Sequence, residues 1–266
     1  MQAILQGIYD AGLSLTVRNA ILIFGFLTLT FHAIWYARKM NESVWKSVLV
    51  LWAGNTLTLT CMAIFSAVHS GQNFFSLSFL TNLPNLPLTM LHGFIYFPIV
   101  SVPLARALKI DASKINDATA ITAIFYQGWG HLGCIFTSCC YGYPSSFGVY
   151  NVFENCTVFP VQLFDALSCF LIGALLALYL KKKEYNAGGV LYPTMLLSYG
   201  FVRFIWEFAR NNKKLWAGLS ADSFHSIALM VVGAIGLYLV IIYNDKKMRR
   251  ERMKEYHKKQ GAGRRK

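Results

Sequence analysis

Length, composition and charge exclude an ordinary soluble domain. The chain has 266 residues, of which 55% are hydrophobic and 14% are charged, whereas soluble domains usually carry about 25% charged residues. Its net charge of +13 comes largely from the C-terminal tail. A solvated tail that touches anionic lipid explains this charge, and no nucleic-acid partner is expected, because neither interleaved aromatic residues nor a folded binding module accompanies it.

Seven apolar runs follow one another along the chain. A helix needs about 20 mostly apolar residues to cross a bilayer. The sequence therefore predicts an all-α, polytopic membrane protein with seven transmembrane helices, which form one transmembrane domain at residues 1–245 and leave a basic cytoplasmic tail at residues 246–266. The predicted spans are residues 17–37, 44–68, 86–106, 117–138, 158–180, 188–208 and 223–243.

The distribution of Lys and Arg predicts the orientation of these spans. Of the 25 basic residues, 20 lie in the loops after the first, third and fifth runs or in the tail. Short cytoplasmic loops are enriched in Lys and Arg. We therefore expect the N-terminus outside and the C-terminus in the cytoplasm.

Four ionisable residues in four different runs lie at a similar predicted depth. Each is five to seven residues inside the outer end of its run, which at 1.5 Å per residue is about 8–10 Å. A charge inside a span normally faces the bundle interior or a wet cavity. We expect a cavity open to lipid in the outer half of the membrane. Its predicted lining is His92, His131, Gln162, Asp165, Tyr199 and Arg203.

Polar residues of the sixth run share one helix face. Tyr199, Arg203 and Glu207 are spaced by four, and Arg210 follows Glu207 by three. In one interpretation, Arg203 pairs with Glu207 and keeps guanidinium donors free for an anion. In the other, the pair is only structural and the arginines snorkel to the interface near the helix end.

Four cysteines lie at or beyond the outer end of the fourth run, and three interpretations stand. Disulfide bonds in an oxidising compartment are one, with Cys156 bridged to Cys134, Cys139 or Cys140. Metal binding by His131, Cys134, Cys139 and Cys140 is the second interpretation, although their spacing is not a typical zinc pattern. A thiol-redox or lipid-thiol role is the third. We predict the disulfide.

Three segments resemble the prolipoprotein diacylglyceryl transferase family. They are HLGCIFTSCCYGYPS from His131, FPVQLFDAL from Phe159 and YGFVRFIWEFAR from Tyr199. The chain also departs from the family pattern. His131 stands where the family usually has Arg, and Cys134, Thr137 and Cys139 replace Asn, Asn and Glu. Further departures are Phe94 for the second Gly of a His-Gly-Gly motif, Phe159 for His and Ser223 for Gln.

The resemblance implies an enzyme of the bacterial cytoplasmic membrane that modifies lipoproteins. It would move a diacylglyceryl group from phosphatidylglycerol to the lipobox cysteine behind a prolipoprotein signal peptide, without a metal or soluble cofactor. The implied catalytic residues are His92, His131 and Arg203, and the implied substrate-binding residues are Gln162, Asp165, Tyr199, Glu207 and Arg210. The alternative is a relative on the same scaffold that binds or transports an anionic lipid or small anion, thiol- or metal-linked, without transferase activity.

Overall fold

The chain folds into a bundle of long helices. The structure, a computed structural model, describes residues 2–69 and 90–263, and the side chains of residues 65–69, 90–92 and 255–263 are outside this description. Within it, a short helix α1 (Gln2–Asp10) precedes seven longer ones. These are α2 (Ser14–Lys39), α3 (Val44–His69), α5 (Met90–Ala107), α6 (Ala112–Phe136), α7 (Val161–Lys182), α8 (Leu191–Glu207) and α9 (Ala221–Gly263).

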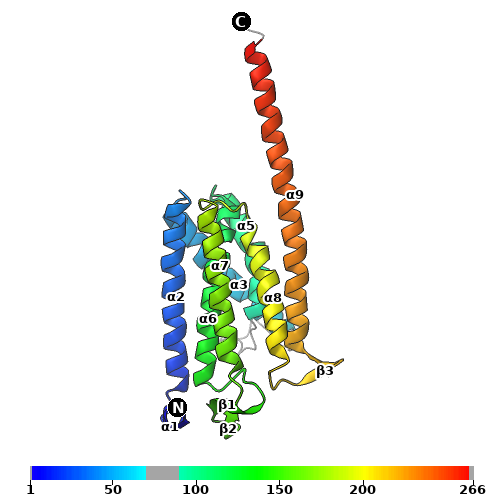
Figure 1. Cartoon of the computed structure of the whole chain (residues 1–266). Coiled ribbons are helices and arrows are strands. Elements are labelled where there is room, and N and C mark those ends of the chain that lie inside the picture. The colour runs from blue at the N-terminus through cyan, green and yellow to red at the C-terminus, as the bar shows by residue number, and fades with distance from the viewer. Residues whose placement is uncertain (1, 70–89, 264–266) are drawn as a thin grey trace.

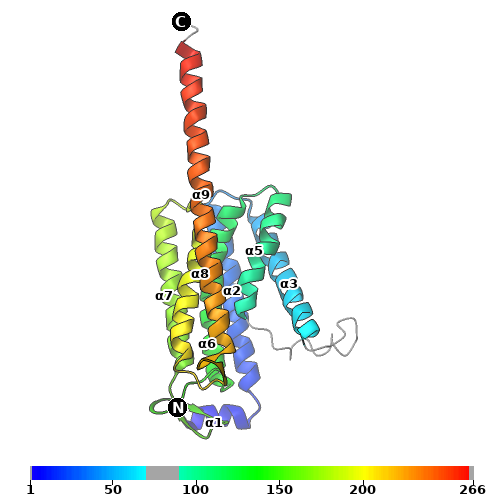
Figure 2. The same cartoon turned by 90° about the vertical axis from the view of Figure 1, so that its right-hand side faces the viewer.

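Two short antiparallel hairpins lie between these helices. Strands β1 (Pro144–Asn151) and β2 (Cys156–Val158) connect α6 to α7, and strands β3 (Lys214–Trp216) and β4 (Leu219–Ser220) connect α8 to α9. Figures 1 and 2 show the long helices side by side, with α1 and the β1–β2 hairpin at one end of the bundle. We call this the hairpin end. The N-terminus lies there, and the C-terminus lies beyond the opposite end (Figure 1).

Four of the described helices are long and apolar enough to cross a membrane: Ser14–Lys39, Val44–Ile64, Val161–Lys182 and Ala221–Lys254. The chain is thus a helical membrane protein by length and composition. Helix α8 has only 17 residues and contains Arg203 and Glu207, while α6 contains Gln127 and His131. These two helices carry part of the polar network described below, and the crossing of all seven remains a prediction.

Helix pairs approach closely where glycine faces a bulky group. A Cβ on Gly128 of α6 would lie 2.5 Å from the ring of Phe170 on α7, and one on Gly173 of α7 would lie 2.8 Å from Phe125 of α6. Helices in lipid associate mainly through such packing of small residues. On α9, a Cβ on Gly233 would lie 2.6 Å from the backbone nitrogen of Leu197 in α8. These contacts pack α6 closely against α7, and α8 closely against α9.

A buried carboxylate fixes the other end of α8. Asp117 of α6 is fully buried and accepts hydrogen bonds of 2.8 Å from the backbone nitrogens of Gly189 and Leu191. The first N–H groups of a helix have no partner within it, so the carboxylate supplies one. Asp117 thereby joins the start of α8 to α6, although its sequence context gave no sign of this contact.

Helix α9 shows no break at the predicted boundary between the membrane domain and the tail. It continues to Gly263 and extends well past the rest of the bundle (Figures 1 and 2). Its distal part is rich in Lys, Arg, Glu and Met, which are strong helix formers. An exposed pair one turn apart, Asp245 and Arg249 at 2.9 Å, adds to this local preference.

Candidate functional site

One face of α8 is buried at the hairpin end, as its spacing predicts. Tyr199, Arg203 and Glu207 are buried on this face, and Arg203 approaches Glu207 at 3.3 Å. Arg210, just after the helix, is only 1% exposed. The interpretation that the arginines snorkel to an interface is therefore wrong, because neither reaches the surface of the bundle.

Arg203 contacts carboxylates from three helices. Its NH1 group lies 3.4 Å from Asp165 of α7 and 3.3 Å from Glu207 of α8, and its NH2 group donates to Asp222 of α9 at 2.8 Å. Both terminal nitrogens are thus occupied. Two of these carboxylates come from other helices and cannot be inferred from the spacing on α8, and the use of the remaining donors by an anion stays a prediction.

Arg210 is held beside the loop that follows α6. Its side chain pairs with Asp165, and its Nε lies 3.8 Å from Glu207. The backbone around Arg210 pairs antiparallel with Gly142. A Cβ at Gly142 would lie 2.7 Å from the carbonyl oxygen of Phe159 and 2.8 Å from that of Ala209, so only glycine fits between the two segments.

A hydrogen-bonded trio joins α6 to α8. The His131 Nε2 atom lies 3.2 Å from the Tyr199 hydroxyl and 3.0 Å from Gln127 Nε2, and Gln127 donates to the Tyr199 oxygen at 3.0 Å. Asp165 lies 3.9 Å from His131 Nε2. Among the described residues, His131 Nδ1 is buried without a hydrogen-bond partner. This side chain therefore retains an unused nitrogen next to the ionic network.

The remaining predicted site residues are placed differently. Gln162 is buried at the start of α7, but its amide donates to the backbone oxygen of Cys139 at 2.8 Å. The side chain of His92 lies outside the described residues. The structure thus brings together six predicted residues, places Gln162 beside the loop, and leaves the catalytic and binding roles as predictions. The six are His131, Asp165, Tyr199, Arg203, Glu207 and Arg210.

Four residues that were not predicted also join the network. Asn212 and Ser220 each donate to Glu207 Oε1 at 2.6 Å, Asp222 binds Arg203, and Gln127 binds His131. Two of them had a signal in the sequence. Gln127 precedes His131 by four on the same helix face, and Asp222 is an acidic residue immediately before the last predicted run. The other two lie in the α8–α9 connection, where no periodicity applies.

Within the described network, carboxylates outnumber guanidiniums. Asp165, Glu207 and Asp222 pair with Arg203 and Arg210. His131 lies 3.9 Å from Asp165, and His225 lies 3.7 Å from Asp222. An anion that binds a guanidinium here therefore competes with these carboxylates. Asp222, whose side chain is 27% exposed, is the one nearest to solvent.

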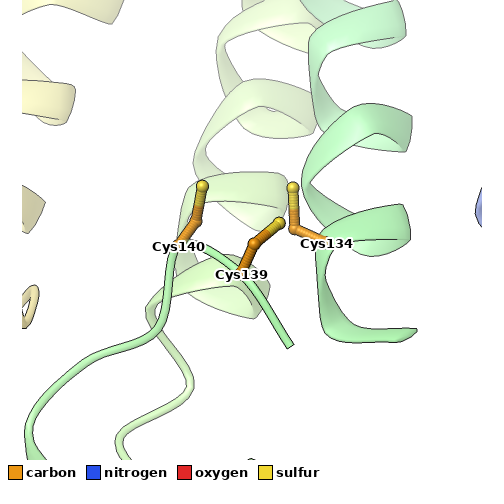
Figure 3. Close-up of side chains that lie close together, drawn as sticks. All are labelled: Cys134, Cys139 and Cys140. Carbon is orange, nitrogen blue, oxygen red and sulfur yellow. The ribbon is translucent and has the colours of Figure 1, made fainter. Parts of the chain in front are cut away.

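Three cysteines converge next to this network. The sulfur atoms of Cys134, Cys139 and Cys140 all lie within 4.8 Å of one another. Figure 3 shows Cys134 at the end of α6 and the other two on the following loop, with the Cys139 sulfur directed toward Cys134 and the sulfurs of Cys134 and Cys140 pointing in the same direction. We call these residues the thiol trio. Cys156 sits instead in β2, opposite Asn151.

All six cysteines are free thiols, so the predicted disulfide with Cys156 is wrong. Hydrogen bonds from Cys134 and Cys139, together with the nearby Arg210 guanidinium, hold the pKa of Cys140 well below its ordinary value despite its burial. The pKa of Cys139 is raised. Its hydrogen bond with Cys134 lowers the pKa, but its hydrogen bond with Cys140 and its burial outweigh that effect. The two adjacent thiols of this loop, Cys139 and Cys140, therefore have their pKa values shifted in opposite directions.

An apolar pocket lies between α2, α3, α5, α6 and α8. Its cavity volume is about 140 Å³, and its lining includes Leu51, Met62, Phe97 and Tyr126. Of the residues predicted to line a cavity, none whose side chain the structure describes borders this pocket. Phe94 connects the two regions, because it lines the pocket and packs edge-on against Tyr199 with 5.6 Å between ring centroids. The described cavity therefore lies beside the network.

The model of the prolipoprotein diacylglyceryl transferase family matches residues 13–239. The chain belongs to this family. The matched range includes α2 to α8 and most of the membrane-length part of α9, so it contains the whole network and the thiol trio.

Two relatives in this family carry the same kind of name. A phosphatidylglycerol–prolipoprotein diacylglyceryl transferase of Clostridium tetani (strain Massachusetts / E88) is 25% identical over 171 residues, which cover 61% of this chain and 66% of the relative. Phosphatidylglycerol–prolipoprotein diacylglyceryl transferase 2 of Clostridium perfringens (strain 13 / Type A) is 27% identical over 172 residues, 59% of this chain and 64% of the relative. The chain thus spans just under two thirds of the length of these relatives.

Four of the seven expected departures from the family pattern lie together at the end of α6 and in the loop after it: His131, Cys134, Thr137 and Cys139. His131 and Cys134 lie one turn apart on α6, and Cys139 follows in the loop. The retained segment from Tyr199 to Arg210 lies directly opposite, in contact through His131 and Asp165. In this member of the prolipoprotein diacylglyceryl transferase family, the α8 segment that resembles the family pattern thus faces the thiol-rich end of α6.

Proposed function

We propose that the protein transfers a diacylglyceryl group from phosphatidylglycerol to the lipobox cysteine of a prolipoprotein. Family membership and the printed names of the two relatives support this function. The structural observation that carries it is a pair of buried arginines at the end of α8, Arg203 and Arg210. Both contact Asp165 of α7. Guanidinium groups bind phosphate through paired hydrogen bonds, so this pair suits a phospholipid headgroup.

The reaction is a displacement at a glycerol carbon. The lipobox sulfur forms a C–S bond, the bond from that carbon to the phosphate oxygen breaks, and glycerol phosphate leaves with the electron pair. A free cysteine has a pKa of about 8.5, so a base must take its proton. His92 and His131 are the candidate bases.

The arginines stabilise the leaving phosphate after a change of partner. We assign Asp222 as the carboxylate that gives way, because it is the most exposed partner of Arg203 and lies at the start of a different helix. Asp165 and Glu207 hold the two guanidiniums in place, and Asn212 and Ser220 fix Glu207.

Further residues shape the substrate pocket. Tyr199 and Gln162 would border the headgroup, one from α8 and one from the start of α7. The apolar pocket beyond Phe94 offers space for acyl chains next to Tyr199. Phosphatidylglycerol and the prolipoprotein signal peptide, both membrane-bound, are the proposed partners.

In the proposed topology all seven long helices cross the bacterial cytoplasmic membrane. The hairpin end faces outward and the C-terminus lies in the cytoplasm. The 20 basic residues on one set of loops support this, as do termini at opposite ends of the bundle. A reporter fused after Lys266 should show cytoplasmic activity, and activity typical of the opposite side would refute the orientation.

The direct test uses purified protein in vesicles with a lipobox peptide. With phosphatidylglycerol, the peptide should gain the mass of a diacylglyceryl group at its cysteine. A peptide with Ser in place of that cysteine, and vesicles of phosphatidylcholine alone, serve as matched controls. Binding of phosphatidylglycerol without any mass gain would overturn the transferase proposal in favour of a lipid-binding relative.

A further inference from the structure

The thiol trio has the composition of a metal site. Two thiolates on one tetrahedral Zn²⁺ lie about 3.8 Å apart, because each Zn–S bond is about 2.3 Å. The sulfurs of Cys134, Cys139 and Cys140 already lie within 4.8 Å of one another without an ion. Small side-chain rotations therefore suffice to place all three around one metal.

The loop after α6 is held in the shape that brings these sulfurs together. The Cys139 nitrogen donates to the Cys134 carbonyl at 3.2 Å, and Gln162 donates to the Cys139 carbonyl at 2.8 Å. Ser138 and Cys140 adopt left-handed backbone angles, with φ of 50° and 58°. These turns put two consecutive cysteines on the same side of the loop, which an extended strand would not do.

His131 supplies a second, independent observation. It precedes Cys134 by three on α6, which puts both on one helix face. Its Nδ1 atom is buried and has no hydrogen-bond partner among the described residues. Its other nitrogen, Nε2, lies 3.2 Å from the Tyr199 hydroxyl. A histidine that binds a metal through one nitrogen usually donates a hydrogen bond from the other, and this arrangement fits that pattern.

We propose that Cys134, Cys139 and Cys140 bind a Zn²⁺ ion, with His131 Nδ1 as the fourth ligand. Three thiolates and one imidazole form a common structural zinc set with tetrahedral geometry. The trio alone meets the distance condition, so the His131 ring turns toward the sulfurs when the ion binds. The ion is separate from the transfer chemistry, for which the family resemblance implies no metal.

The surrounding charges favour a cation at this position. The neighbouring network already holds three carboxylates against two guanidiniums. Thiols bind metal in the deprotonated form, which adds further negative charge. A divalent ion offsets that charge inside a buried region, where unbalanced charges are costly. Arg210 is a hydrogen-bond partner of Cys140 and would orient its thiolate from outside the metal's own ligand shell.

The ion would fix the position of Arg210. Cys139 and Cys140 lead directly to Gly142, whose backbone pairs with that of Arg210. Zinc would therefore tie the end of α6 to the segment that carries an arginine of the proposed phosphate site. With His131 bound to metal, His92 becomes the base for the lipobox thiol.

The experiment measures metal binding in the absence of lipid and peptide, so its outcome is independent of the transferase assay. The full chain is purified in detergent under anaerobic, reducing conditions, and its zinc content is measured by mass spectrometry of the metal. Cobalt is then exchanged into the site, because its absorption bands report tetrahedral geometry and thiolate ligands. Alkylation of each cysteine with and without zinc is mapped on the intact fold.

We expect one zinc ion per chain, protection of the trio from alkylation by zinc, and a cobalt spectrum with thiolate bands. Cys134→Ser, Cys139→Ser and Cys140→Ser should each lower zinc affinity at least about 10–100-fold, the loss caused even by removing a partner outside the first ligand shell. His131→Asn should lower affinity and change the cobalt spectrum. Cys156→Ser is the matched control, since it removes a thiol of the same end of the protein that lies outside the trio.

Three outcomes would overturn the proposal. The first is reduced wild-type protein that binds no zinc. The second is equal loss of affinity in Cys156→Ser and in the trio variants, and the third is a disulfide within the trio in protein isolated without reductant. An unchanged affinity and cobalt spectrum in His131→Asn would overturn its assignment as the fourth ligand. The unfolding temperature and zinc affinity of wild-type protein stripped of zinc and unfolded by heat are measured for comparison. They show how much zinc binding is lost through unfolding alone in a variant that is only destabilised.

Discussion

Replacing Arg203 by Lys and by Ala separates its structural contribution from its proposed contact with phosphate. Arg203→Ala leaves the buried Glu207 Oε2 without its nearest cation, whereas Asp165 keeps Arg210 and Asp222 reaches solvent. Removing one member of a buried ion pair destabilises a fold by about 3–5 kcal/mol. We therefore expect the Ala variant to lose that order of stability.

Arg203→Lys keeps the positive charge but loses the planar pair of donors. A lysine ammonium can satisfy Glu207 or a phosphate oxygen, but it cannot present the parallel N–H groups that Arg offers. One charge-assisted hydrogen bond is worth about 1.5–3 kcal/mol, so transfer should fall about 10- to 150-fold in a protein that still folds. Arg18→Lys, at the hairpin end of α2, is the matched control and should transfer at the wild-type rate.

The assay combines thermal unfolding in one detergent with the peptide mass-shift measurement in phosphatidylglycerol vesicles. Rates are divided by the folded fraction, so that lost stability is not counted as lost catalysis. If Arg203→Lys transfers as fast as the wild type, Arg203 is only a structural partner of Glu207 and the phosphate assignment is wrong.

Three further substitutions or reactions probe neighbouring groups. Asp222→Asn should free a donor of Arg203 and strengthen the binding of a short-chain phosphatidylglycerol, and weaker binding would contradict this. The free energy of unfolding should change by less than about 1 kcal/mol, because the ion pair is partly exposed. Asp117→Asn should destabilise the start of α8 by about 1.5–3 kcal/mol through one lost charged hydrogen bond, seen as a lower unfolding temperature, with the transfer rate per folded molecule unchanged. In metal-free protein, Cys140 should lose its proton at a lower pH than Cys139, because the pKa of Cys140 is lowered and that of Cys139 is raised. The ratio of Cys140 to Cys139 alkylation should therefore fall as the pH rises and Cys139 deprotonates, and a constant ratio would count against the difference.

Some features of this protein follow from local sequence. The long helices lie close to the predicted runs because a run of apolar residues satisfies its backbone internally, whatever its neighbours are. The buried face of α8 follows from spacings of three and four, which are properties of a single helix. His131 and Asp165 could be selected because a shared depth in a membrane is set by counting residues from the ends of the runs.

Other features depend on which segments pack against each other. The spacing on α8 could not show that Asp222 would occupy Arg203, nor that Arg210 would be buried. Gly142 and Arg210 are 68 positions apart and meet through backbone pairing, which no helical period encodes. The described pocket lies beside the network, and only the packing of the helices decides which residues enclose it.

The cysteines show most clearly which contacts a sequence cannot predict. Their number and position near one loop predict reactivity of some kind, but bridging depends on the separation and direction of their side chains. The β1–β2 hairpin carries Cys156 to a position opposite Asn151, while two left-handed residues bring Cys139 and Cys140 close to Cys134. Sequence alone therefore determined the helices, their polar faces and the family of this protein. Tertiary structure decided the partners of its charges and the grouping of its thiols, because these depend on distances of a few ångströms between segments far apart in the chain.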